Sequence, residues 1–133
     1  MNIDNYSTQI FETCLYSRNL EAAKTFYVDR LGFSLYTYVP DTLLFLKMKS
    51  GMLLIFNPDK SKDKEGLPPH FAEGKQHIAF NIDEEKYEKV KMELQKEGID
   101  IIHEEKWPSG SKSFYFEDPE GHVLEFVPAK VWD

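Results

Sequence analysis

The sequence predicts an α+β fold built from two βαβββ modules, and three observations lead to this prediction. Short segments of alternating apolar and polar residues, bounded by Gly, Pro, Asn and Asp, are typical of β-strands. One amphipathic segment in each half has helical spacing, and the two segments end at Gly32 and Gly98. MLLIFNP at residues 52–58 resembles HVLEFVP at residues 122–128, which indicates an internal duplication and sets Ile55 opposite Glu125.

In the first half, a strand is expected first, and a helix follows it. Asn19 is a suitable N-cap for this helix, because its short side chain can accept a hydrogen bond from the first turn. Pro40-Asp41 and Ser50-Gly51 then divide three further strands. The predicted strands of this half cover residues 10–16, 33–39, 42–48 and 52–57.

The second half repeats this order after a polar segment at residues 58–75, which reads as a linker or a functional flap. A helix is predicted at residues 84–96, and Asp118-Pro119-Glu120-Gly121 is a strong hairpin turn. The predicted strands cover residues 76–82, 99–103 with a continuation to 107 as the alternative, 113–116 and 122–127. The expected organisation is a single domain at 1–133, with modules at about 8–58 and 76–128 and a linker at 59–75.

Composition excludes several classes of function. The net charge of −7 repels polyphosphate backbones, so no nucleic-acid partner is expected. No apolar run approaches the roughly 20 residues that a membrane span needs, and the N-terminal residues lack a signal-peptide pattern, so a cytoplasmic protein without a membrane partner is expected. Cys14 is the only cysteine and has no partner for an internal disulfide; it is a packing residue, a reactive thiol or a soft metal ligand.

Glu125 is the most unusual residue, because a charge inside the apolar strand VLEFV requires a partner. Alternation places Glu125 on the sheet face opposite the helices, together with Glu12, Cys14, His77, Asn81, Ile55, Ser113 and Tyr115. If the sheet curves around this face, Glu12, His77 and Glu125 converge as two carboxylates and one imidazole, a ligand set suited to a divalent metal. The alternatives are a buried ion pair with a lysine and a carboxylate–histidine hydrogen bond without metal.

Three segments, ETCLYSRNLEAAKTFYVDRLGF, QHIAFNI and SFYFEDPEGHVLEF, together resemble the vicinal oxygen chelate superfamily. This superfamily contains glyoxalase I, fosfomycin-resistance enzymes, extradiol dioxygenases and bleomycin-resistance proteins. The resemblance implies that the two modules form a cup-shaped, partly open mixed β-sheet around a metal, with the helices outside. By position, Glu12 falls where many members have a histidine, while His77 and Glu125 fall on a ligand histidine and a ligand glutamate.

Two departures from the family pattern leave the subfamily open. Ile55 stands where glyoxalase I has a further carboxylate ligand, and Glu12 replaces one of the two histidines of extradiol dioxygenases. A site with one imidazole and two carboxylates should accept Zn, Ni, Mn, Fe or Co. The expected catalytic residues are Glu12, as a ligand that leaves the metal to act as a base, and Tyr115. The expected substrate pocket contains Tyr115, Ser113, Asn81, Ile55 and Trp107, the last in a loop placed to gate the cup.

Three functions follow from these expectations. The first is a metal-dependent lyase, isomerase or dioxygenase-like enzyme that chelates a small oxygenated substrate. The second is a metal-free protein of the bleomycin-resistance type that sequesters a ligand. The third is a structural or regulatory dimer, since modules of this family commonly pair across chains and a homodimer is expected. The remaining histidines, His70, His103 and His122, are expected to have surface roles.

Overall fold

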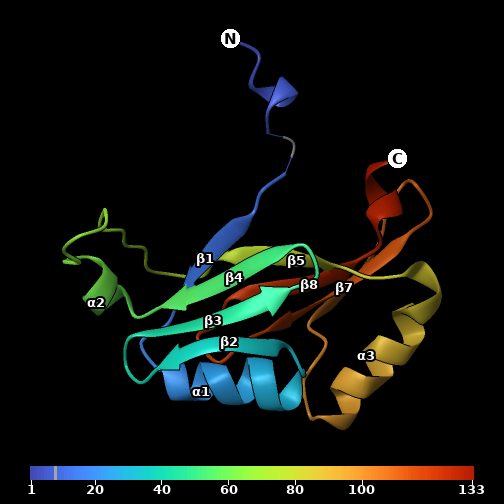
Figure 1. Cartoon of the computed structure of the whole chain (residues 1–133). Coiled ribbons are helices and arrows are strands. Elements are labelled where there is room, and N and C mark those ends of the chain that lie inside the picture. The colour runs from blue at the N-terminus through green and yellow to red at the C-terminus, as the bar shows by residue number, and fades with distance from the viewer. Residues whose placement is uncertain (8) are drawn as a thin grey trace. The chain divides into compact units, whose positions relative to one another are not determined.

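The computed structural model describes residues 1–7 and 9–133, and it divides into two compact units, Met1–Glu73 and Gly74–Asp133 (Figure 1). Each unit contains one open four-stranded mixed sheet and its own helices, which confirms the predicted α+β class. Thr8, at which the first module was predicted to begin, lies outside the described residues.

The sheet of the first unit has the strand order β1-β4-β3-β2, with β1 parallel to β4 and the other pairs antiparallel. The connection between the parallel strands includes a helix, as such connections usually do. The elements are η1 (Ile3–Asn5), β1 (Glu12–Tyr16), α1 (Leu20–Lys24) continued by the π-helix η2 (Thr25–Arg30), β2 (Ser34–Val39), β3 (Leu43–Met48), β4 (Gly51–Phe56) and α2 (Pro58–Ser61).

The second unit repeats this topology, with the order β5-β8-β7-β6 and with β5 parallel to β8. The other pairs are again antiparallel, so both units are βαβββ modules. The elements are β5 (His77–Asn81), η3 (Glu84–Lys86), α3 (Tyr87–Lys96), β6 (His103–Lys106), β7 (Lys112–Glu117), β8 (Val123–Val127) and η4 (Ala129–Trp132).

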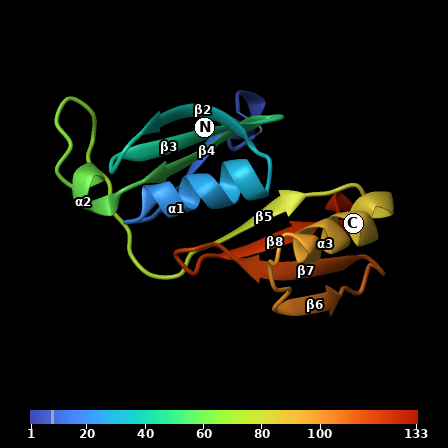
Figure 2. The same cartoon turned by 90° about the horizontal axis from the view of Figure 1, so that it is seen from below.

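The residues at the helix ends explain where the helices begin and end. The side chain of Asn19 accepts a hydrogen bond of 3.0 Å from the Ala22 backbone N–H, so it caps α1 as predicted. Gly32 and Gly98 have φ values of 80° and 74°, the left-handed conformation that commonly ends a helix. The apolar side of α1 packs against the first sheet, and Leu20 and Ala23 are at most 2% exposed (Figure 2).

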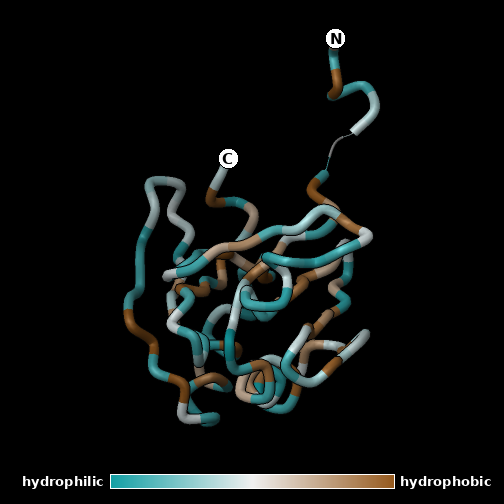
Figure 3. Tube along the Cα trace, turned by 90° about the vertical axis from the view of Figure 1, so that its left-hand side faces the viewer, coloured by the Kyte–Doolittle hydropathy of each residue, from teal (hydrophilic) through white to brown (hydrophobic). Residues whose placement is uncertain are grey.

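The core of the second unit lies between α3 and one face of its sheet. Alternation puts the larger apolar residues of β5, β7 and β8 on this face: Ile78, Phe80, Phe114, Phe116, Leu124 and Phe126. Figure 3 shows hydrophobic and hydrophilic residues interspersed along the trace. The Tyr87 ring of α3 lies 5.3 Å from the Phe114 ring of β7, in an edge-to-face arrangement. The opposite face of the same strands is therefore left to carry the polar residues, which include His77 and Glu125.

Two of the predicted elements are wrong. Residues 99–102 are not a strand: Ile99 is buried directly after α3, and β6 begins at His103 and ends at Lys106, which matches the predicted continuation. The segment at residues 58–75 is not entirely irregular, because Pro58–Ser61 forms α2. The Arg18 guanidinium ties this segment to the first unit through Asp59 at 3.0 Å and Glu73 at 2.7 Å.

Candidate functional site

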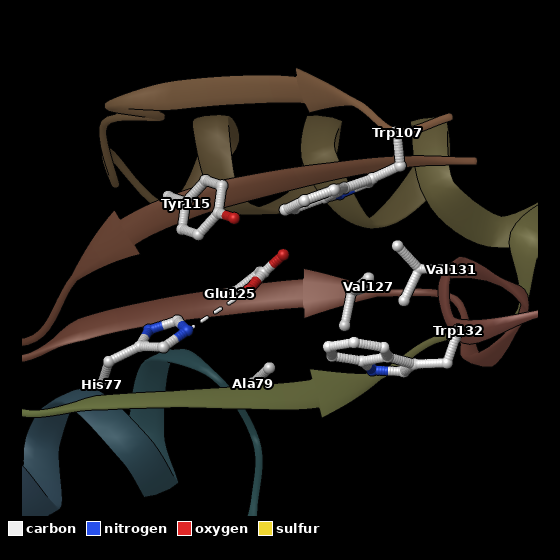
Figure 4. A pocket seen from close by; sticks show the side chains of 8 residues that line it. All are labelled: His77, Ala79, Trp107, Tyr115, Glu125, Val127, Val131 and Trp132. Atoms are coloured by element: carbon white, nitrogen blue, oxygen red, sulfur yellow. Dashed lines mark ion pairs between the residues drawn. The ribbon is translucent and has the colours of Figure 1, made fainter. Parts of the chain in front are cut away.

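A cavity of about 300 Å³ opens on the polar face of the second sheet (Figure 4). Strands β5, β7 and β8, the loop after β6 and the C-terminal helix η4 all contribute side chains to it. The lining residues are His77, Ala79, Trp107, Tyr115, Glu125, Val127, Val131 and Trp132. Four of these lining residues, His77, Trp107, Tyr115 and Glu125, are among the site residues that the sequence predicts.

His77 is held with a defined ring orientation. Its Nδ1 atom lies 2.8 Å from the backbone carbonyl oxygen of Val123, the partner of His77 in the parallel ladder. Because a carbonyl oxygen only accepts, Nδ1 must carry the proton and donate it. The other nitrogen, Nε2, then faces the cavity and lies 3.3 Å from Oε1 of Glu125. Metal-binding histidines are commonly oriented in this way, because one ring N–H donates to a carbonyl and the other nitrogen faces the metal.

Glu125 is a buried carboxylate in the middle of β8, with only 6% of its surface exposed. Its strand partners are Ala79 and Tyr115, so it has a neighbouring strand on each side. Of the described residues, His77 is the one whose basic group forms an ion pair with Glu125. An ionised carboxylate in this position needs a positive charge nearby, which either a protonated His77 or a metal ion can supply.

Tyr115 contributes a protonated phenol to the same end of the cavity. Burial raises the pKa of Tyr115, and a hydrogen bond to Glu125 raises it further, while a hydrogen bond with Ser113 acts in the opposite direction. The Tyr115 ring lies 6.0 Å from the His77 ring and 5.6 Å from the His103 ring. Because its pKa is above the ordinary value, Tyr115 remains a hydrogen-bond donor at neutral pH.

Three of the predicted pocket residues, Ser113, Asn81 and Ile55, do not line the cavity. Ser113 is fully buried behind Trp107, and its hydroxyl accepts a hydrogen bond of 2.9 Å from the indole N–H. Asn81 lies at the end of β5, and its side-chain amide donates to the Val127 carbonyl at 3.5 Å. Ser113 therefore positions a lining residue instead of touching a ligand.

Four lining residues were not among those predicted from the sequence, although the strand alternation indicates the position of two of them. Ala79 and Val127 lie two residues beyond His77 and Glu125 on the same strands, so alternation predicts that they share the polar face. Val131 and Trp132 belong to η4, beyond the last strand. No periodicity at these positions predicts that the chain turns back toward the cavity.

Ile55 is not on the face of the first sheet that carries Glu12. The ladders pair Glu12 with Met52 and Leu15 with Ile55, so Leu54 shares the face of Glu12 and Ile55 lies on the opposite face. In the second sheet the corresponding first residue, His77, pairs with Val123, two residues before Glu125. Leu54, and not Ile55, is therefore the counterpart of Glu125, and Ile55 belongs to the buried core.

Glu12 opens β1 in the first unit, as His77 opens β5 in the second, and its side chain is exposed. Among residues 1–7 and 9–133, no group of three or more His, Cys, Asp or Glu side chains is arranged to hold a metal. The pair that the structure brings together is His77 with Glu125, and the contribution of Glu12 stays a prediction. Burial, followed by the Glu12 charge, raises the pKa of the Cys14 thiol, which disfavours a reactive thiolate.

Among the other three histidines, the prediction of a surface role is wrong for His122, whereas His70 is half-buried. His122 is 1% exposed, and its Nδ1 accepts a hydrogen bond of 3.0 Å from the Gln76 backbone, which joins the turn before β8 to the start of β5. His70 packs against Phe56 and lies 2.7 Å from the Tyr16 hydroxyl in the first unit. His103 is exposed, as predicted.

The fold and the cavity define a class: an α+β protein of two βαβββ modules with a His–Glu pair in a pocket of small-molecule size. The family model described as the Glyoxalase/Bleomycin resistance protein/Dioxygenase superfamily matches residues 9–126. The chain belongs to this superfamily, which confirms the resemblance noted in the sequence. None of the helices in the described part of the chain has the length and apolar character needed to cross a bilayer.

Similar structures agree with this assignment. The crystal structure of lactoylglutathione lyase from Agrobacterium tumefaciens is 34% identical, covers 96% of this chain and 98% of that chain, and superposes with a TM-score of 0.91. A glyoxalase family protein from Enterococcus faecalis is 30% identical over 90% of this chain and 96% of that chain, with a TM-score of 0.67. Glutathione transferase FosA from Serratia marcescens is 43% identical over 49 residues, which are 37% of this chain and 33% of that protein.

Proposed function

We propose that this protein is a metal-dependent enzyme of the superfamily that acts on a small oxygenated molecule by lyase, isomerase or dioxygenase-like chemistry. The observation that carries the proposal is the orientation of His77 toward Glu125. Nδ1 of His77 is committed to the Val123 carbonyl, and Nε2 faces a buried carboxylate. A divalent ion beside this pair would satisfy both the imidazole lone pair and the carboxylate charge.

The donor set fits such an ion. One imidazole nitrogen and carboxylate oxygens suit Zn, Mn, Fe, Co or Ni, and we propose Glu12 as the third ligand. A bound divalent ion would supply Lewis acidity to two neighbouring oxygens of the substrate. The protonated Tyr115 phenol is placed to donate a hydrogen bond to one of these oxygens, because it points to the same end of the cavity as Glu125 (Figure 4).

Metal content is the direct test of this proposal. The wild-type protein, purified without chelator, should contain about one equivalent of a divalent metal per chain. His77→Ala and Glu125→Gln should reduce metal affinity strongly, and Glu12→Gln should reduce it if Glu12 is a ligand. His103→Ala is the matched control, because it removes a histidine that does not line the cavity. If none of Zn, Mn, Fe, Co and Ni binds to the wild type, the proposal is wrong.

A metal-free ligand-binding protein is the second candidate function. It is favoured by the mostly apolar wall of the cavity and by the 3.3 Å separation of His77 and Glu125, which also suits a direct charged hydrogen bond. Ligand binding that is unchanged by EDTA would support this candidate against the enzyme. The predicted homodimer and cytoplasmic location remain predictions, and the mass in solution tests the former.

A further inference from the structure

The cavity has two chemically different ends. His77, Tyr115 and Glu125 form the polar end, where the proposed function binds substrate oxygens. The other end is apolar and consists of Trp107, Val127, Val131 and Trp132 (Figure 4). The chain contains two tryptophans, and both line this cavity. A ligand that fills the cavity must therefore be polar at one end and apolar at the other.

The Trp107 indole is fixed in place. Its N–H donates to the hydroxyl of Ser113, which is fully buried in β7, over a distance of 2.9 Å. The ring therefore cannot turn its polar edge into the cavity without losing this hydrogen bond. It presents a preformed aromatic surface, and preformed surfaces bind ligands with a smaller loss of entropy.

The Trp132 indole reaches the cavity from the opposite side (Figure 4). It is 91% exposed, which is unusual for the largest apolar side chain. A ligand between the two indoles would remove much of this apolar surface from water. Aromatic rings also gain from stacked or edge-to-face contacts with an indole.

We propose that the apolar end binds a planar aromatic group of the substrate between Trp107 and Trp132, while oxygen donors of the same molecule reach His77, Tyr115 and Glu125. The oxygen-binding half of this inference rests on the proposed function, whereas the aromatic half does not. The cavity volume of about 300 Å³ is at the lower end of the range for ligand sites and suits a molecule with a single ring.

Two hydroxamates with the same metal-chelating head test the aromatic half. Benzohydroxamate carries a phenyl group where acetohydroxamate carries a methyl group. With the Mn²⁺- or Zn²⁺-loaded protein, benzohydroxamate should bind at least ~10-fold more tightly, because the phenyl group buries more apolar surface. It should also change the tryptophan fluorescence, since both fluorophores line the cavity. Equal affinities for the two hydroxamates would overturn the proposal.

Substitutions of the two tryptophans test whether their indoles cause the preference for benzohydroxamate over acetohydroxamate. Trp132→Ala should reduce the ratio of the two affinities to about 2-fold or less, while Trp132→Phe should preserve most of it. Trp107→Ala and Trp107→Phe should behave in the same way. Trp132 is so exposed that its replacement should not unfold the protein, so its variants are the easier ones to interpret.

Tyr36→Ala is the control, because it removes another exposed aromatic ring that does not line the cavity. A ratio that is unchanged in Trp132→Ala contradicts the proposal, even if the variant alters the oligomeric state.

Failure of metal chelation can be distinguished from failure of aromatic binding. If neither hydroxamate binds, chelation and the proposed function are wrong, and benzyl alcohol with metal-free protein decides the aromatic half. Benzyl alcohol should then shift the indole N–H resonances of both Trp107 and Trp132 in ¹H–¹⁵N spectra. If both resonances stay unchanged, the aromatic half is also wrong.

Discussion

Nε2 of His77 lies 3.3 Å from Oε1 of Glu125, although the two residues are not directly opposite each other on β5 and β8. His77 is paired with Val123, and Glu125 is paired with Ala79, so the contact is diagonal across the parallel ladder. Ala79, the ladder partner of Glu125, lines the same cavity as these two side chains. The imidazole and the carboxylate therefore meet because both side chains lie on the same face of adjacent strands.

Tyr115→Phe should leave metal affinity almost unchanged and reduce turnover by about 100-fold, the lower range for loss of a proton donor. The reason is that the phenol lines the cavity but is proposed to contact only the substrate. Metal titration and steady-state kinetics on the same preparation separate the two effects. Loss of metal binding in Tyr115→Phe would instead show that Tyr115 supports the ligands.

The ionisation of Tyr115 provides an independent test of the same site. Burial and the hydrogen bond to Glu125 both raise the pKa of Tyr115. Glu125→Gln removes the negative charge, so the Tyr115 phenol should ionise at lower pH in this variant than in the wild type. An ultraviolet pH titration, with Tyr115→Phe to identify the signal, measures this shift. A shift in the opposite direction would contradict the described contact.

Glu104 should make stability depend on pH. Hydrogen bonds from Lys91, at 2.9 and 3.0 Å, and from Tyr87, at 2.7 Å, lower the pKa of Glu104. A lowered pKa in the folded state contributes stability above the unfolded pKa of about 4.3, and this contribution is lost as pH falls through the folded value. Glu104→Gln should therefore lower the free energy of unfolding by about 1 kcal/mol at pH 7, a small value because the pair is partly exposed.

Urea unfolding of the wild type and Glu104→Gln at several pH values measures this effect. The difference between the two proteins should shrink as the pH is lowered from neutral to about 3, below the unfolded pKa. Glu93→Gln is the control, because Glu93 has only a 3.9 Å contact with Lys96 on the exposed side of α3. A difference that grows on acidification would show that the sign of the pKa shift is wrong.

Gly51→Ala should destabilise the protein much more than Gly32→Ala. Both glycines have positive φ, 148° and 80°, so alanine is strained at each. A Cβ atom at Gly51 would lie 2.5 Å from the Phe11 carbonyl oxygen, which also accepts the Met52 N–H, whereas nothing lies within 4 Å at Gly32. We expect a loss of about 1 kcal/mol for Gly32→Ala and of at least ~2 kcal/mol for Gly51→Ala.

Equilibrium unfolding of the two variants checks this ranking. The comparison is internally controlled, because the same side chain is added to the same unit at two positive-φ positions. Equal losses would mean that the backbone of Phe11 moves away from β4 without cost.

The turn and cap residues could be predicted from the sequence because they act locally. Asn19 caps α1, and Gly121 has the positive φ expected at the end of the Asp118-Pro119-Glu120-Gly121 turn. Asp118 accepts hydrogen bonds from the Glu120 and His122 backbones, at 3.0 and 2.9 Å. Such interactions depend only on neighbours in sequence, so residue type is sufficient to predict them.

The register of β4 could not be predicted in the same way. The four residues from Leu53 to Phe56 are all buried, so alternation between polar and apolar residues does not reveal which face each occupies. The similarity of MLLIFNP to HVLEFVP then suggested a match that is one residue away from the hydrogen-bonded ladder. In a strand, a shift of one residue moves every side chain to the other face, which is why Ile55 was wrongly placed.

The candidate site was partly predictable for a related reason. Glu125 interrupts an apolar strand and is therefore conspicuous, and His77 starts the strand that pairs with it. The apolar end of the cavity has no such signal. Trp107 and Trp132 come from a loop and a terminal helical turn, and their meeting across the cavity depends on the tertiary fold.

Long-range ¹H–¹⁵N correlation of the histidine side chains during Zn²⁺ titration tests the central claim most directly, because it reports the two nitrogens of His77 separately. Nδ1 should remain protonated, since it donates to the Val123 carbonyl, and Nε2 should take the shift of a metal-coordinated nitrogen. His103 and His122 should show no such change. Coordination through Nδ1, or a His77 signal that does not respond to Zn²⁺, would contradict the account.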